Sequence, residues 1–349
     1  MGLFLKIIPG EFATASRDKR ELEVARELGH KIIIIAKGSK RENNIIKEDG
    51  WEIHVRTTRP LNIRKIVGIN RLLSIITWAH YASKFKADFI SGHNITGLLI
   101  GWISTIINLL RKRTILIYDA HELESGRNSN RGLVRERITI YLEKYLIKKS
   151  SLSIVVNETI AVELQKQYKL KTIPLVVRNI PSYWQIDDEV CLKRRKELLE
   201  CLNLRVEQKK FLIMYHGGIA KGRGLENLIL ATTHFSDVVF LILGKGEDTY
   251  VKTLYNLIKQ SKIEERVIFH PFVPLNDLWQ FIGASDLGMV TIENVCLSYY
   301  YSLPNKLLEN IQAETPVIGS DFPEISRIIN QYKIGLTCNP NEVASIVAG

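Results

Sequence analysis

At positions 211–225 the chain reads Phe211-Leu212-Ile213-Met214-Tyr215-His216-Gly217-Gly218-Ile219-Ala220-Lys221-Gly222-Arg223-Gly224-Leu225. An apolar run typical of a strand passes through a glycine-rich turn into a helical pattern. Glycines such as Gly217 and Gly218 let a backbone approach a phosphate closely, and the N–H groups that open a helix can bind it. Lys221 and Arg223 add cationic donors. The stretch indicates a candidate phosphate site, with an ordinary strand-to-helix turn as the alternative.

The same alternation of short apolar runs and helical patterns extends along the whole chain. The predicted strands are residues 4–8, 31–36, 51–55, 88–91, 114–118, 152–156, 173–177, 211–215, 238–243, 267–269, 287–290, 316–318 and 334–337. The predicted helices are residues 20–28, 66–84, 133–148, 159–168, 190–203, 225–232, 248–260, 275–282, 306–312 and 324–330. Apolar runs joined by helices indicate parallel sheets covered on both faces.

The pattern pauses after residues 178–181, which read Arg-Asn-Ile-Pro. We therefore expect an α/β protein of two doubly wound, Rossmann-like domains, residues 1–178 and 179–349, with a hinge near 178–186. Ligands of such folds bind outside the carboxyl ends of the strands.

The composition fits a globular protein, with 349 residues, 46% hydrophobic and 24% charged. The four cysteines match no zinc-site spacing, which favours a reducing compartment. No secretory signal pattern precedes Asp18. Residues 89–110 carry no charge, yet their polar residues favour a strand, a turn and a buried helix over a membrane span.

Two further clusters carry candidate chemistry. Residues 302–309 read Ser302-Leu303-Pro304-Asn305-Lys306-Leu307-Leu308-Glu309. Ser302 or Asn305 is predicted to cap a helix there. Glu309 is predicted to accept hydrogen bonds from ribose, with an exposed helix glutamate as the alternative. The second cluster, at the end of a predicted strand, is Tyr118-Asp119-Ala120-His121-Glu122-Leu123, in which His121 is either functional or a surface histidine.

Taken in order, these motifs resemble the family 4 (group 1) retaining glycosyltransferases of GT-B fold. The resemblance also rests on Leu243-Gly244-Lys245-Gly246, on Phe269-His270-Pro271-Phe272-Val273, on Ala284-Ser285-Asp286-Leu287-Gly288 and on Thr315-Pro316-Val317-Ile318. It covers nearly the whole chain and implies two domains that face a cleft, with a nucleoside-diphosphate sugar bound between them.

The resemblance implies a role for each matching residue. Arg223, Lys306 and the backbone of residues 303–306 would hold the diphosphate, and Glu309 the ribose. Phe272 and Val273 would flank the base, and His121 would hydrogen-bond the donor sugar. Neither a cofactor nor a metal is expected, because cationic groups neutralise the leaving diphosphate and the chain has no Asp-x-Asp motif.

The sequence departs from the family pattern at four places. Tyr301 replaces the first carboxylate of the E-x-x-x-x-x-x-x-E motif, Gly218 replaces an arginine of the phosphate loop, leaving Lys221 as a substitute, and Glu314 replaces a glycine. The chain also stops at Gly349, where relatives continue into helices that cross back, so a truncated chain is one expectation.

The net charge of +11 is compatible with phosphorylated substrates, an anionic membrane, nucleic acid or plain solubility. Between residues 53 and 87 there is no acid, and the cations are Arg56, Arg59, Arg64, Lys65, Arg71, Lys84 and Lys86. With Trp78, Tyr81 and Phe85 as possible apolar anchors, this segment is either an anionic-membrane surface or a core helix with a basic face. No nucleic-acid module is recognisable.

We expect a cytoplasmic enzyme, peripheral on the inner face of the cell membrane, that transfers sugar with retention to a lipid-linked or glycan acceptor in cell-envelope or polysaccharide biosynthesis. A non-catalytic partner of such an enzyme and a sugar-nucleotide epimerase of the same fold are the alternatives.

Overall fold

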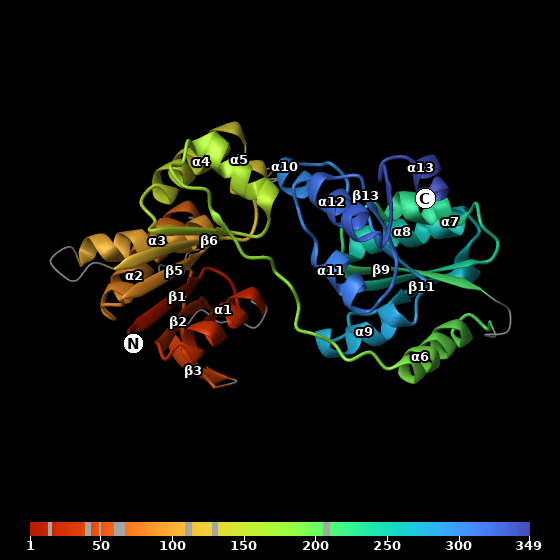
Figure 1. Cartoon of the computed structure of the whole chain (residues 1–349), viewed down its shortest axis with the longest axis horizontal. Helices are drawn as coiled ribbons and strands as arrows, with labels where there is room; N and C mark the ends of the chain where they lie inside the picture. The colour runs from red at the N-terminus through yellow and green to blue at the C-terminus, as the bar shows by residue number, and fades with distance from the viewer. Residues whose placement is uncertain are drawn as a thin grey trace. The chain divides into compact units, whose positions relative to one another are not determined.

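A computed structural model describes residues 1–12, 16–38, 43–48, 50–58, 67–108, 114–127, 132–204 and 210–349. The chain divides into two compact units, Met1–Arg178 and Asn179–Gly349. Figure 1 shows that each unit is built around its own sheet with helices against it.

Within the described residues, the sheet of the first unit has eight strands in the order β3-β4-β2-β1-β5-β6-β7-β8. The strands are β1 (Leu3–Ile8), β2 (Lys31–Lys37), β3 (Asn44–Glu48), β4 (Trp51–Arg56), β5 (Phe89–His93), β6 (Ile115–Ala120), β7 (Leu152–Val155) and β8 (Leu175–Val176). All neighbours are parallel except β3 and β4. The direction of the chain across the sheet reverses between β1 and β5, and ligands of doubly wound folds bind beside such a reversal.

The helices of the first unit form two layers. They are α1 (Ser16–Glu27), α2 (Val67–Ser83), α3 (Asn94–Ile107), α4 (Leu133–Ile147) and α5 (Glu158–Tyr168), with a 3₁₀ turn at Glu124–Gly126. Right-handed crossovers place α1, which leads toward β2, on one face and the helices that lead toward β8 on the other. Helix α3 contacts both α2 and α4, in agreement with a single layer of these helices.

The sheet of the second unit has, among the described residues, six parallel strands in the order β11-β10-β9-β12-β13-β14. These are β9 (Phe211–Ile219), β10 (Val238–Gly246), β11 (Val267–His270), β12 (Leu287–Val290), β13 (Val317–Ser320) and β14 (Gly335–Cys338). This is the Rossmann strand order, and its reversal falls between β9 and β12. The glycine-rich turn therefore follows a strand that borders the reversal.

The helices of the second unit cover both faces of its sheet. They are α6 (Asp188–Glu200), α7 (Leu225–Thr232), α8 (Asp248–Gln260), α9 (Leu275–Gly283), α10 (Leu297–Tyr300), α11 (Asn305–Gln312), α12 (Pro323–Tyr332) and α13 (Val343–Ala348), with a 3₁₀ turn at Glu264–Arg266. One apolar core joins the sheet to α7, α8 and α13, and others join it to α6, α9, α11 and α12. Helix α11 packs so closely on β12 that a Cβ at Gly288 would lie 1.9 Å from the Asn310 side-chain oxygen.

The prediction of two doubly wound parallel-sheet domains is confirmed. The expectation of purely parallel sheets is wrong at β3, whose exposed edge residues pair antiparallel with β4 and were not predicted as a strand. Leu28, the last residue of the helix predicted over residues 20–28, is 68% exposed and lies beyond α1, which ends at Glu27.

Residues 89–108, the described part of the uncharged segment, behave as the sequence predicts. They form β5 and the 14-residue helix α3, whose buried residues face the sheet. Across the described part of the chain, no helix combines the length and apolarity that a membrane crossing requires. Residues 111–113, the predicted basic end of this segment, lie outside the described residues.

We predict that Gly92→Ala lowers the free energy of unfolding by about 1–3 kcal/mol, as overpacking usually does. An added Cβ at Gly92 would lie 2.3 Å from the Leu98 backbone nitrogen, and α3 would have to move. The matched control is Gly68→Ala in α2, where the Cβ meets nothing within 4 Å. Removing this helical glycine should stabilise by up to about 1 kcal/mol. Equal urea midpoints for the two variants would show that α3 does not depend on this contact.

Candidate functional site

The glycine-rich stretch of the second unit begins inside β9, whose last residues, 217–219, pair with β10, and the turn itself follows at residues 220–224. Glycines bring these two strand ends close together. A Cβ at Gly244, at the end of β10, would lie 1.9 Å from the Gly217 carbonyl oxygen. A Cβ at Gly218 would meet nothing within 4 Å, and both Gly217 and Gly218 are exposed. The carboxyl end of β9 therefore presents bare backbone that a ligand can approach.

Lys306 lies buried at the start of α11, beside this turn. Its Nζ sits 3.7 Å from the centre of the Tyr215 ring and, within the described residues, has no hydrogen-bond partner. Burial and then repulsion from Arg223 lower the pKa of Lys306 well below its ordinary value, against the opposing attraction of Glu309. A buried ammonium without an acceptor is costly, so this position favours an incoming anion.

Glu309 follows Lys306 by one turn of α11 and is also buried, contrary to the alternative of an exposed helix residue. Its Oε2 lies 2.8 Å from Nε2 of His216, which comes from the end of β9. This contact ties α11 to the glycine-rich turn and fixes the direction of the carboxylate.

The predicted caps of α11 are wrong. Pro304 occupies the N-cap position and no side chain caps the helix. Ser302 donates instead to the Tyr299 carbonyl at 2.8 Å, and the Asn305 side-chain oxygen accepts from Asn179 at 3.0 Å. The first N–H groups of a helix have no partner inside it, and this end carries partial positive charge.

The remaining predicted residues lie around this centre. Arg223 is half-buried with its guanidinium 4.6 Å from the centre of the Tyr299 ring, and its carbonyl accepts from Thr291 at 3.0 Å. Lys221 is exposed, and Tyr301 and Leu303 are half-buried between α10 and α11. Phe272, 69% exposed, and the half-buried Val273 follow β11 at the sheet edge. Gly217, Gly244, Arg223, Lys306 and Glu309 are thus brought together, whereas no contact recorded in the described residues joins Phe272 or Lys221 to them.

His121 belongs to a second polar centre, in the first unit, at the carboxyl ends of β1, β5 and β6. Its backbone N–H donates to the Asn94 side-chain oxygen at 3.1 Å, and its Nε2 lies 2.9 Å from Asp119 Oδ2. Arg17 clamps the other oxygen of Asp119 through Nε at 3.1 Å and Nη2 at 3.0 Å. His121 is therefore held both by its backbone N–H and by its ring.

Lys6 is the cation at the centre of this polar group. Its fully buried Nζ contacts Asp18 at 2.8 Å, Asp119 at 3.1 Å and Glu21. Burial alone would lower the pKa of Lys6, but these carboxylates raise it above its ordinary value. Burial alone would raise the pKa of the Asp18 carboxyl group, but Lys6 and the hydrogen bond from His93 lower it to about 2.

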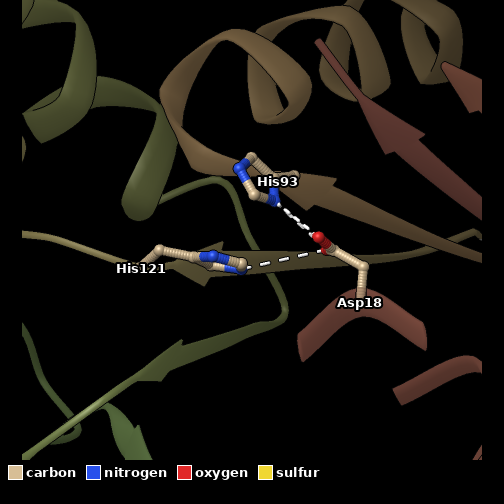
Figure 2. A group of neighbouring side chains, drawn as sticks. All are labelled: Asp18, His93 and His121. Carbon is tan, nitrogen blue, oxygen red and sulfur yellow. Dashed lines mark hydrogen bonds and ion pairs between the residues drawn. The ribbon is translucent and has the colours of Figure 1, made fainter. Parts of the chain in front are cut away.

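A second histidine lies against His121. His93, at the end of β5, has its ring centroid 3.9 Å from that of His121, and its Nδ1 is 2.9 Å from Asp18 Oδ2. Figure 2 shows both rings directed at the Asp18 carboxylate.

Sequence reasoning missed Lys6, Asp18, His93 and His216 as members of these centres. The available signal was a lysine inside the apolar strand at residues 3–8, because a charged residue there needs a buried partner. His216 was visible within the glycine-rich stretch, but its partner is remote in the sequence.

Two doubly wound units of this kind define the GT-B class, and the comparison with solved structures supports it. The structure aligns with HepE of Anabaena in complex with UDP-glucose at a TM-score of 0.73 and 16% identity, over 99% of this chain and 88% of that one. It aligns with WaaG, described as a glycosyltransferase involved in lipopolysaccharide biosynthesis, at 0.66 and 15% identity, over 99% and 90%. Likeness at these identities shows the fold.

The sequence of the second unit matches a family model. Residues 203–349 match the family model of glycosyl transferases group 1. The probable glycosyltransferase WbjE of Pseudomonas aeruginosa is 24% identical over 172 residues, which are 47% of this chain and 41% of that relative. The resemblance to the group 1 glycosyltransferases of GT-B fold is confirmed, with the family match carried by the second unit.

We predict that Lys6→Met costs about 3–5 kcal/mol of folding stability, because it leaves buried carboxylates without their cation. Lys37→Met, at an exposed end of β2, is the matched control and should change little. The pKa of Asp18 is lowered from 3.8 to about 2 in the folded protein, so the stability that Lys6 confers is present above pH 3.8 and is lost toward pH 2. The deficit of Lys6→Met should therefore shrink over that interval in urea unfolding. A deficit independent of pH over this interval would exclude the Asp18 carboxylate as its source.

Proposed function

We propose that this protein transfers a sugar, with retention of configuration, from a nucleoside-diphosphate sugar to a lipid-linked or glycan acceptor in cell-envelope or polysaccharide biosynthesis. One observation carries the donor assignment: Lys306 has a buried amino group with no hydrogen-bond partner among the described residues. It lies beside Arg223 and a bare glycine turn. A diphosphate supplies the negative charge and the acceptor oxygens that this position lacks.

The rest of the nucleotide can be fitted to the same unit. Glu309, oriented by His216, is our candidate for the ribose hydroxyls. Phe272 offers an exposed aromatic face to the base, with Val273 beside it. HepE, which has a similar fold, was solved in complex with UDP-glucose. This supports a uridine nucleotide as the first ligand to try.

The proposed chemistry needs charge neutralisation more than a strong base. The bond from the anomeric carbon to the diphosphate breaks, and the acceptor oxygen bonds to that carbon on the same face. The acceptor proton passes to the departing phosphate oxygen. Arg223, Lys306 and the open end of α11 stabilise the leaving group, and Lys221 adds charge at the rim. We propose that these cations take the place of a metal and that no cofactor is used.

His121 is our candidate for a hydrogen bond to the donor sugar from the first unit. Its position is fixed by Asn94 and Asp119, so the imidazole needs little reorganisation to bind a hydroxyl.

We further propose that the first unit docks on an anionic membrane at the cytoplasmic side. The expected apolar anchors do not serve. Trp78 is buried with its Nε1 bonded to the Thr57 carbonyl, and Tyr81 and Phe85 pack together with His54. Arg59, Arg64 and Lys65 of the predicted basic segment lie outside the described residues.

Helix α4 offers a better docking surface. Its exposed apolar stripe, spaced by three and four residues, consists of Val134, Ile138, Tyr141 and Tyr145, the first and third of which are 74% exposed. The exposed cations Arg137, Lys144, Lys148 and Lys149 accompany it. An apolar stripe beside cations suits the surface of an anionic bilayer.

The function is tested by incubating the protein with a panel of nucleoside-diphosphate sugars and measuring thermal unfolding. A donor at a hundred times its dissociation constant should stabilise by about 2.7 kcal/mol. Absence of protection by every donor would refute the proposal. Protection without sugar transfer to any lipid-linked or glycan acceptor would favour a non-catalytic partner, the reading that Tyr301 and Glu314 motivate.

We predict that UDP binding is accompanied by proton uptake at Lys306. The diphosphate should return the lowered pKa of Lys306 toward its ordinary value of 10.5. Lys306 therefore takes up a proton at any pH between its pKa in the free protein and its pKa in the complex. Calorimetry in buffers of different ionisation enthalpy measures this uptake. Lys306→Arg should abolish it, because an arginine stays protonated, while Lys221→Arg should keep it. Buffer-independent heats at every such pH would show that Lys306 does not meet the phosphates.

We predict that Lys144→Gln with Lys148→Gln weakens binding to anionic liposomes by about 30-fold, since each cation near such a surface contributes about 1 kcal/mol. The control pair is Lys252→Gln with Lys259→Gln, which removes the same charge from exposed positions of α8. Co-sedimentation at low and high salt provides the measurement. Equal losses in the two pairs would mean that net charge, and not α4, governs binding.

A further inference from the structure

Three metal-ligating side chains from separate elements of the first unit converge on one point. Asp18 lies in the first turn of α1, His93 ends β5, and His121 follows β6 (Figure 2). Their candidate ligand atoms all lie within 4.8 Å of one another. Asp18 Oδ1 is 3.1 Å from His93 Nδ1 and 3.8 Å from His121 Nε2.

These separations match the geometry of a tetrahedral ion. Ligands about 2.1 Å from a zinc ion at tetrahedral angles are about 3.4 Å apart, between the two measured separations. The Asp18 side chain is fully buried, whereas those of His93 and His121 are 21% and 20% exposed. The protein thus supplies three ligands and leaves one side open, through which an ion can enter.

The charge around the three residues accepts a dication. Lys6 and Arg17 face the carboxylates of Asp18, Glu21 and Asp119, which leaves one net negative charge when both histidines are neutral. Asp18, Glu21 and Asp119 also lie within ligand distance of one another. The Lys6 ammonium contacts all three, so that second group is already filled and takes no ion.

We propose that Asp18, His93 and His121 bind a divalent d-block cation of the zinc class. Two imidazoles and one carboxylate favour zinc, cobalt or nickel over magnesium or calcium, which prefer sets of oxygen ligands. Occupation takes the His121 Nε2 that otherwise lies against Asp119. If His121 contacts the donor sugar, as in the proposed function on which this step rests, the bound ion inhibits transfer.

Cobalt binding tests the site without reference to activity. Titration of the full chain with Co²⁺ should produce the intense visible absorption of a tetrahedral ion at one equivalent. His93→Gln and His121→Gln should each weaken this binding by more than about 100-fold, since losing only an outer-shell partner costs 10–100-fold. The matched control is His80→Gln, at an exposed position of α2, which should bind as the parent does. Absence of the tetrahedral spectrum, or its persistence in both ligand variants, overturns the proposal. Circular dichroism of each variant confirms that it is folded.

Inhibition is measured separately, as the rate with Zn²⁺ divided by the rate of the same variant after chelator treatment. Parent protein and His80→Gln should be inhibited, and His93→Gln should require more than about 100-fold more zinc, the same loss that is expected of its cobalt binding. Cobalt binding without zinc inhibition would retain the site and place His121 away from the sugar. Transfer abolished by chelation and restored by zinc would overturn the inhibitory role and the metal-independent mechanism together.

Discussion

A lysine ammonium removed from water needs negative charge nearby, and this constraint organises both units. Lys6 finds its charge inside the protein, where carboxylates from α1 and β6 contact it and raise its pKa. Lys306 has no hydrogen-bond partner in the part of the chain that the structure describes, and its pKa is lowered by burial and by Arg223. The first lysine is therefore structural and holds strands and helix together. The second lysine favours the binding of an anion from outside the protein, which is why the second unit is the better candidate for an anionic donor.

Topology explains why both lysines lie near ligand positions. In each sheet the strand order reverses once beside the first strand, between β1 and β5 and between β9 and β12. Helices diverge to opposite faces at such a reversal, so the carboxyl ends of the strands are left uncovered. His93 ends β5 and His121 follows β6 at one reversal, and His216 lies near the carboxyl end of β9 at the other. The polar groups gather there because the backbone offers space that no helix fills.

Most of the fold could be predicted because apolar runs and helical periodicity are local signals. Each predicted strand and helix has a counterpart in the structure, and the glycine-rich turn lies where its pattern indicates. What escaped prediction depends on remote partners or on weak local patterns. The contact between His216 and Glu309 joins residues 93 positions apart, and that between Lys6 and Asp119 joins residues 113 apart. The edge strand β3 and the short helices α10 and α13 escaped because they are short and carry little periodicity.

The substitution of Glu314 for a glycine illustrates how a departure from a family pattern can be tolerated. Glu314 adopts φ of 55°, in the left-handed region that costs a side chain about 1–2 kcal/mol. The turn closes α11 before β13, and its backbone is held by bonds from Glu314 N–H to Ile311 and from Thr315 N–H to Asn310. Those bonds fix the conformation whatever residue occupies it, so the glutamate bears strain without moving α11. The helix that carries Lys306 and Glu309 thus keeps its register against β12, where the contact between Gly288 and Asn310 leaves no room for a shift.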